Sequence, residues 1–288
     1  MKKILFFISI IFAGNAMAQP KIITQAIINT TTNVIAPEEE DVTAIQNQGT
    51  GGGAMMFRNF GDGETKSVTY LKNDLVKTVI KTDMGRSTII RNNASKLTTT
   101  LMEMMGNKTG FYITDEEQVA MRKSMDSIMK ARTKDSTTLT RRPTETPVAI
   151  SYTEETKKIA GFNCKKAYLI ATRLLGLKDT SVVWYSPEFK INNLPTTGGG
   201  LAMGFMGSGG GNTGGLSGLA QIDGFVMRYE TKMRRGRIMT VEVTKVDFTK
   251  EIADKEFDIP KDFELKPMKD MQTMLQGGPG NFQIRRGN

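Results

Sequence analysis

Five short segments between residues 65 and 113 alternate apolar and polar side chains, with turn-forming residues between them. The connections, such as Lys72-Asn73 and Gly106-Asn107, are too short for a crossover between parallel strands. Consecutive strands must therefore pair antiparallel as a meander. The strands are expected at residues 65–71, 74–81, 86–91, 96–104 and 109–113.

The hydrophobic period changes after the fifth segment. Thr114 precedes Glu117 by three residues, which is the spacing of a helix capping box. An apolar stripe at helical spacing follows, formed by Met121, Met125, Ile128 and Met129. The pattern predicts one amphipathic helix at about residues 114–133 that covers a face of the sheet.

Residues 152–187 are expected to form the centre of the core. A polar strand runs to Ile159, turns at Ala160-Gly161 and returns as a strand from Phe162 that is apolar on both faces. Such strands usually lie in the middle of a fold, covered from both sides. The same segment holds the single cysteine, Cys164, and the single tryptophan, Trp184.

The last strands follow a glycine-rich stretch. Residues 225–234 alternate cleanly, and their inward-facing side chains include Phe225, Met227 and Tyr229. The partner strand shifts phase between Val243 and Val246, which predicts a bulge. An expected closing anchor consists of Phe257, Ile259 and Phe263. The whole pattern predicts a mainly β fold with minor α: a strongly curved antiparallel sheet or open half-barrel with a covering helix.

The N-terminus predicts export. A short basic start, an apolar run from Ile4 to Ala13 and the small-residue site Ala16-Met17-Ala18 form a secretory signal peptide, residues 1–18. We therefore expect a soluble protein in the periplasm or outside the cell. The remaining chain is expected as a single domain at 19–267 with a flexible glycine-rich insertion at 198–218. A disordered tail is expected at 268–288.

Composition narrows the chemistry. The sequence contains no histidine, which removes Ser-His-Asp and Cys-His catalysis and most zinc sites. Cys164 cannot form an intramolecular disulfide and is expected to be buried and inert. Because neither paired carboxylates nor a phosphate-binding loop is evident, we expect no enzyme activity, cofactor or metal. The formal net charge of +9 favours anionic envelope components, including peripheral membrane contact, over nucleic acid.

A resemblance to a known family rests on two stretches and their order. These are Ile159-Ala160-Gly161-Phe162-Asn163-Cys164-Lys165-Lys166-Ala167 and, later, Val183-Trp184-Tyr185-Ser186-Pro187-Glu188. They resemble exported Gram-negative proteins of unknown function of the GLPGLI type, over roughly residues 65–267. The glycine-rich insertion after Ile191 departs from that pattern. The resemblance implies a fold like that of the lipoprotein carrier LolA, and it supplies no catalytic residues.

The function expected from these observations is non-enzymatic binding of an apolar or amphiphilic ligand, such as a lipid or an acyl chain. The nineteen methionines allow a pliable apolar lining, core filling or, less simply, copper binding. The alternative function is an envelope structural or interaction module, with a protein partner, whose core is filled by its own side chains. Expected ligand-lining residues are Met121, Met125, Ile128, Met129, Trp184, Phe225, Met227 and Tyr229.

Overall fold

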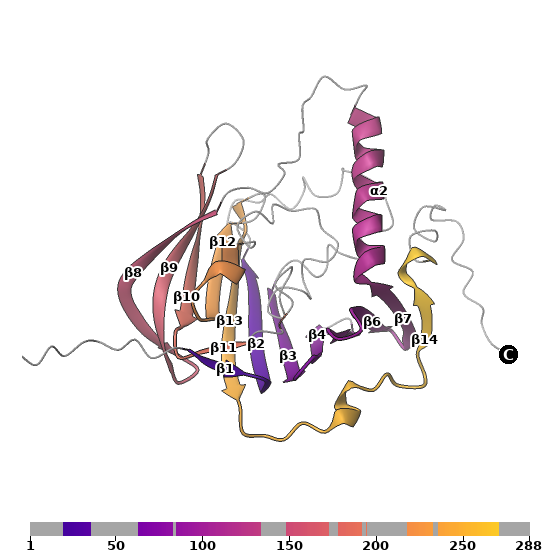
Figure 1. The fold of residues 1–288 in the computed structure, drawn as a ribbon, viewed down its shortest axis with the longest axis horizontal. Helices are drawn as coiled ribbons and strands as arrows, with labels where there is room; N and C mark the ends of the chain where they lie inside the picture. The colour runs from indigo at the N-terminus through magenta and orange to yellow at the C-terminus, as the bar shows by residue number, and fades with distance from the viewer. Residues whose placement is uncertain are drawn as a thin grey trace, which may run out of the picture.

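A single large sheet dominates the structure, which is a computed structural model (Figure 1). It describes residues 20–35, 63–82, 85–133, 148–172, 178–191, 194, 218–232 and 236–270. The expected signal peptide, residues 198–217 of the glycine-rich insertion and residues 271–288 lie outside these ranges. The expected tail is described only at residues 268–270, which are helical.

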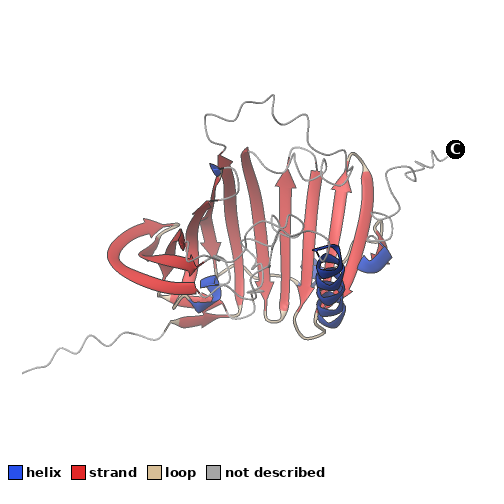
Figure 2. Ribbon diagram, turned by 90° about the horizontal axis from the view of Figure 1, so that it is seen from above, coloured by secondary structure: helices blue, strands red, loops and turns tan. Residues whose placement is uncertain are grey.

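The large sheet has twelve strands in the order β14-β7-β6-β5-β4-β3-β2-β13-β12-β10-β9-β8. It curls without closing, because its outermost described strands, β14 and β8, do not pair with each other (Figure 2). The fold is therefore mainly β, as predicted. In chain order the strands are β2 (Gln25–Ile35), β3 (Gly63–Lys72), β4 (Leu75–Thr82), β5 (Gly85–Asn92), β6 (Leu97–Met104), β7 (Asn107–Thr114), β8 (Val148–Ile159), β9 (Phe162–Thr172), β10 (Lys178–Ser186), β12 (Phe225–Lys232), β13 (Ile238–Asp247) and β14 (Glu264–Pro267).

The predicted meander is confirmed as strands β3 to β7, each antiparallel to the next. The connections that the structure describes are short turns, and each contains a residue in the left-handed backbone conformation. Met105 and Gly106, for example, have φ values of 49° and 81°, as a two-residue hairpin turn requires. The predicted phase shift in β13 is also confirmed, because its register against β2 breaks between Val243 and Lys245.

The segment expected at the centre of the core lies near one end of the sheet. Strand β8 is outermost, and β9 is its neighbour. On β9, Ala167 and Leu169 are fully buried, whereas Tyr168 and Ile170 on the opposite face are only half-buried. The periodicity correctly predicted that both faces of β9 are apolar. Periodicity alone cannot show how completely each face is covered, and the Ile170 face is less buried than the Leu169 face.

Two clusters of buried side chains form the core. The first joins β9, β10, β12 and β13 through residues that include Leu169, Val183, Tyr229 and Val241. The second lies where the small parallel pair of β1 (Lys21–Ile23) and β11 (Phe189–Ile191) meets the large sheet. Its rings pack closely, with 5.0 Å between the ring centroids of Phe162 and Phe189.

The predicted helix is confirmed as α2 (Asp115–Thr133). Its capping box is present: the Glu117 amide donates to the Thr114 hydroxyl at 3.2 Å, and the Thr114 amide donates to the Glu117 carboxylate at 2.9 Å. Arg91 of β5 holds the first turn through two hydrogen bonds to Asp115, at 2.5 and 2.8 Å. Figure 1 shows that α2 stands up from the end of β7 instead of lying along the sheet.

A long C-terminal segment crosses the sheet on the side opposite α2 (Figure 1). We call residues 248–263, which include the short helix η5 (Asp254–Phe257), the strap. The Lys72 ammonium on β3 donates to the Ile252 carbonyl at 2.8 Å and to Asp254 at 2.6 Å. At the other end, Lys108 of β7 pairs with Asp262 at 2.5 Å. The strap then continues into β14, which pairs parallel with β7.

Of the residues expected to form the closing anchor, Phe257 is buried as expected and Ile259 is not. Ile252 and Phe257 are buried beneath the strap, with 3% and 7% of their surfaces exposed. Ile259 is 37% exposed and does not anchor the segment. The reason is geometric: the chain leaves η5 in an extended conformation at Asp258, so alternate side chains point away from the sheet.

The strap and α2 lie on opposite faces of the sheet (Figure 1). We call the face from which α2 rises the inner face, and the face beneath the strap the outer face. On β4, Val76, Thr78 and Ile80 belong to the inner face, while Lys77 and Val79 belong to the outer face. No helix within the described ranges is long and apolar enough to cross a membrane.

Candidate functional site

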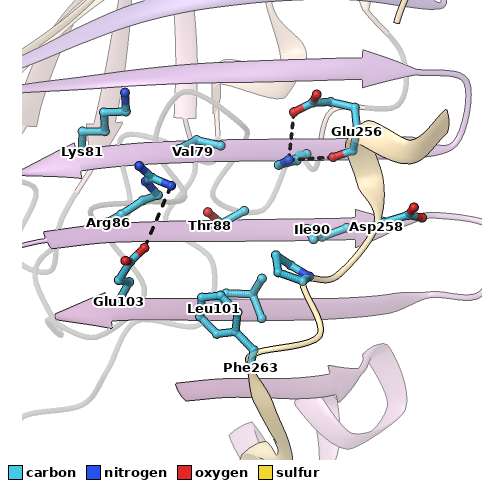
Figure 3. Close-up of a pocket in the computed structure, with 12 residues that line it drawn as sticks. Val79, Lys81, Arg86, Thr88, Ile90, Leu101, Glu103, Glu256, Asp258 and Phe263 are labelled. Atoms are coloured by element: carbon cyan, nitrogen blue, oxygen red, sulfur yellow. Dashed lines mark hydrogen bonds and ion pairs between the residues drawn. The ribbon is translucent and has the colours of Figure 1, made fainter. Parts of the chain in front are cut away.

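A groove of about 280 Å³ lies on the outer face between the sheet and the strap (Figure 3). This volume is slightly below the range of about 300–1,000 Å³ that is usual for small-molecule pockets. The strands β4, β5 and β6 form its floor, and the strap forms its roof. Its apolar part consists of Val79, Thr88, Ile90, Leu101, Pro260 and Phe263.

The floor follows directly from the alternation of the meander. Val79 lies opposite Thr88, and Thr88 lies opposite Leu101, so the three side chains share one row across the strands. Thr88, Ile90 and Leu101 are buried, whereas Val79 is half-buried. The roof exists because Pro260 and Phe263 follow η5 on the strap. Sequence reasoning placed Phe263 in an anchor but did not bring it to these strands.

Charged side chains stand at both ends of the groove. Figure 3 shows Lys81, Arg86 and Glu103 at one end, and Glu256 with Asp258 at the other. Arg86 and Glu103 are 4.0 Å apart, at the limit of an ion pair, and both are well exposed. The groove therefore has an apolar middle. Cations outnumber carboxylates at the Lys81 end, and carboxylates outnumber cations at the Glu256 end.

The strap end of the groove is firmly held. The Lys77 ammonium donates to the Glu256 carbonyl at 2.6 Å and to its carboxylate at 2.9 Å. The same ammonium lies 5.9 Å from the centroid of the Tyr70 ring. Burial, together with the nearby Glu256 charge, raises the pKa of the Tyr70 hydroxyl. Tyr70 therefore stays neutral across the physiological range and can serve only as a hydrogen-bonding group.

A second hollow of about 280 Å³ lies where the β3–β4 turn meets Asp254 of the strap. Turn and polar residues supply most of its lining, including Asn73, Asp74 and Asn92. It offers less apolar surface to a ligand than the groove under Phe263 does. The groove is therefore the stronger candidate.

Of the residues expected to line a ligand site, those whose side chains the structure describes contribute to neither hollow. Phe225, Met227 and Tyr229 belong to the packed core, with exposures of 5%, 0% and 1%. Met121 is half-buried on α2. The side chains of the other three helix residues, Met125, Ile128 and Met129, lie outside the described part of the structure.

Trp184 is partly buried against the second core cluster. Its ring lies on the outer face, with the ammonium groups of Lys157 and Lys166 at 5.7 and 5.9 Å from its centroid. Glu155 also pairs with the Lys166 charge at 3.0 Å, and the two lysine side chains cover the ring. Trp184 therefore contributes to packing here.

Cys164 is fully buried, and burial raises the pKa of its thiol to about 11. Because the thiolate is the reactive form, we expect no labelling of folded protein by iodoacetamide at pH 8 and complete labelling in denaturant. Rapid labelling of the folded protein would contradict the placement of β9. Within the described residues, no three side chains of the His, Cys, Asp and Glu types are grouped to hold a metal ion.

Comparison with known proteins identifies no family for this chain. No family model and no curated protein matches its sequence. Similar solved structures include PNGF-II in the C2 and P21 space groups, with TM-scores of 0.39 and 0.37 and identities of 14% and 17%. Each match covers 88% of this chain and 33% of the other, so the chain spans about a third of their length. Similarities this weak support no functional argument.

Proposed function

We propose that this protein is a non-enzymatic binding protein for an amphiphilic ligand, and that the groove beneath the strap holds the apolar part of that ligand. The observation that carries the proposal is the row of Val79, Thr88 and Leu101, which faces Phe263 across a partly empty space. The half-buried side chains of Val79 and Phe263 and the exposed Pro260 supply apolar surface, and removing that surface from water favours ligand binding. The charged ends suit a ligand that is polar at its end and apolar in its middle.

Binding fits the chemistry of the groove better than catalysis does. Its titratable side chains are lysine, arginine and carboxylate groups, and the Glu256 carboxylate is already paired with Lys77. We further propose, from the N-terminal signal-like sequence, that the protein works in the periplasm or outside the cell.

A substitution that fills the groove tests this proposal. Replacing Val79 with tryptophan places a large ring in the space between the floor and Phe263. We expect the affinity for decyl maltoside, a neutral amphiphile, to fall at least about tenfold. Isothermal titration calorimetry below the micellar concentration measures this.

Val182→Trp is the matched control. Val182 is also a half-buried valine on the outer face, but it lies on β10, far along the sheet from β4. It should leave binding unchanged, and both variants should unfold within a few degrees of the wild type. Equal affinities of wild type and Val79→Trp would exclude the groove as the ligand site.

The second candidate function is a structural or interaction module of the cell envelope. The core favours it, because Phe225, Met227 and Tyr229 are almost completely buried among the protein's own side chains. The same titration separates the two functions. A wild-type protein that binds no decyl amphiphile would support the module and remove the carrier.

A further inference from the structure

A row of charged side chains crosses the outer face at one end of the groove. Directly opposed residues in an antiparallel sheet point to the same face, so the register defines this row. It runs from β3 to β7 through Lys66, Lys81, Arg86, Glu103 and Lys108.

Three consecutive members of this row are cations. Lys66 lies directly opposite Lys81, and Lys81 lies directly opposite Arg86. Neighbouring strands are separated by about 4.8 Å, and like charges in this arrangement destabilise a sheet. A sheet gains nothing structural from such a row. Binding of an anion by the three cations would explain the arrangement.

The local carboxylates only partly neutralise these cations. Glu64 pairs with Lys66 at 3.0 Å, in a highly exposed contact, and Glu103 lies 4.0 Å from Arg86. Lys81, at the centre, is exposed and has no ion-pair partner within the described ranges. Exposed pairs of this kind are weak, so both flanking cations can reorganise toward a stronger anion.

The row borders the apolar part of the groove. Lys81 and Val79 project from the same face of β4 and are two residues apart, which corresponds to about 7 Å along the strand. Arg86 and Thr88 have the same relation on β5. A ligand lying along the strands therefore meets the cations at one end and the apolar floor directly after them.

We propose that Lys66, Lys81 and Arg86 bind the anionic headgroup, a phosphate or a carboxylate, of the amphiphile whose apolar part enters the groove. This inference rests on the proposed function and adds the ligand's charge and its orientation. The headgroup lies over the cation row, and the tail points toward Glu256 and the strap. Lysine and arginine both form strong charge-assisted hydrogen bonds with such oxygens.

Amphiphiles that share one tail and differ in headgroup test the inference. The probes are decyl phosphate, decanoate, decyl maltoside and decyltrimethylammonium, each titrated below its micellar concentration into the full-length protein. We expect both anionic probes to bind at least about tenfold more tightly than decyl maltoside at low salt, and the cationic probe to bind most weakly. The advantage should shrink as salt increases, because the cations are exposed.

Three variants locate the effect. The double variant Lys81→Gln/Arg86→Gln should abolish most of the anionic advantage, measured as the ratio of decyl phosphate affinity to decyl maltoside affinity in that same variant. Lys232→Gln, which removes one exposed cation from β12 on the same face, is the control and should preserve the advantage. Glu103→Gln should strengthen anion binding, since it removes the carboxylate that competes for Arg86.

The outcomes separate this inference from the proposed function. Equal affinities for all four probes would overturn the headgroup assignment while leaving amphiphile binding in place. If none of the probes binds, both the headgroup assignment and the proposed binding function are wrong. Inorganic phosphate that binds as tightly as decyl phosphate would show that the row takes a free anion, which also overturns the assignment to a headgroup.

Discussion

Replacing Leu169 with alanine is expected to lower the free energy of unfolding by about 2–5 kcal/mol. Leu169 is fully buried in the first core cluster, between Ile150 on β8 and Ser181 on β10. Gly218 approaches its side chain closely, since a Cβ built there would lie 3.3 Å from a Leu169 methyl carbon. The neighbouring side chains of the cluster, such as Val183, Tyr229 and Val241, are themselves buried on paired strands and cannot easily collapse into the cavity. Urea unfolding monitored by circular dichroism measures the loss.

The adjacent residue provides the control. Ile170 has a similar volume but points to the opposite face, where its cross-strand neighbours Ala149 and Thr180 are exposed. Ile170→Ala should cost clearly less than Leu169→Ala. Equal losses would mean that both faces of β9 are covered alike, as the sequence alone suggested, and would contradict the described position of β9 beside the edge strand.

The features that the sequence predicted correctly depend on residues that are close together in the chain. The meander follows from period-two alternation and short turns, and both are properties of short segments. The start of α2 follows from Thr114 and Glu117, whose reciprocal hydrogen bonds need no tertiary partner. The β13 bulge follows from a phase shift that is visible within that strand alone.

The candidate site could not be predicted, because it depends on partners far apart in the chain. The strap has no clear periodicity, and Lys77 and Glu256 are 179 residues apart. The cation row appears only when the registers of β3, β4 and β5 are known. In the sequence its members are lysines and an arginine on strands that alternate normally. The methionine stripe gave a stronger local signal, and it lies on α2, whereas the groove lies on the outer face.

Replacing Phe257 with alanine is expected to release the strap and cost about 3–5 kcal/mol. Phe257 is 7% exposed and anchors η5, next to the Lys77–Glu256 pair. Without its ring, the exposed ion pairs of the strap cannot supply the lost burial energy, since each contributes little. The roof of the groove should then separate from the floor, and decanoate binding should fall with it.

Hydrogen exchange distinguishes local release of the strap from general unfolding. In Phe257→Ala, amides in the β14–β7 pairing should exchange much faster than in the wild type, whereas buried amides of β9 should keep most of their protection. Ile259→Ala is the control, because Ile259 is 37% exposed and lies only two residues further along the strap. It should change stability by about 0.5 kcal/mol or less. If both variants bind decanoate as the wild type does, the strap is not the roof of the ligand site.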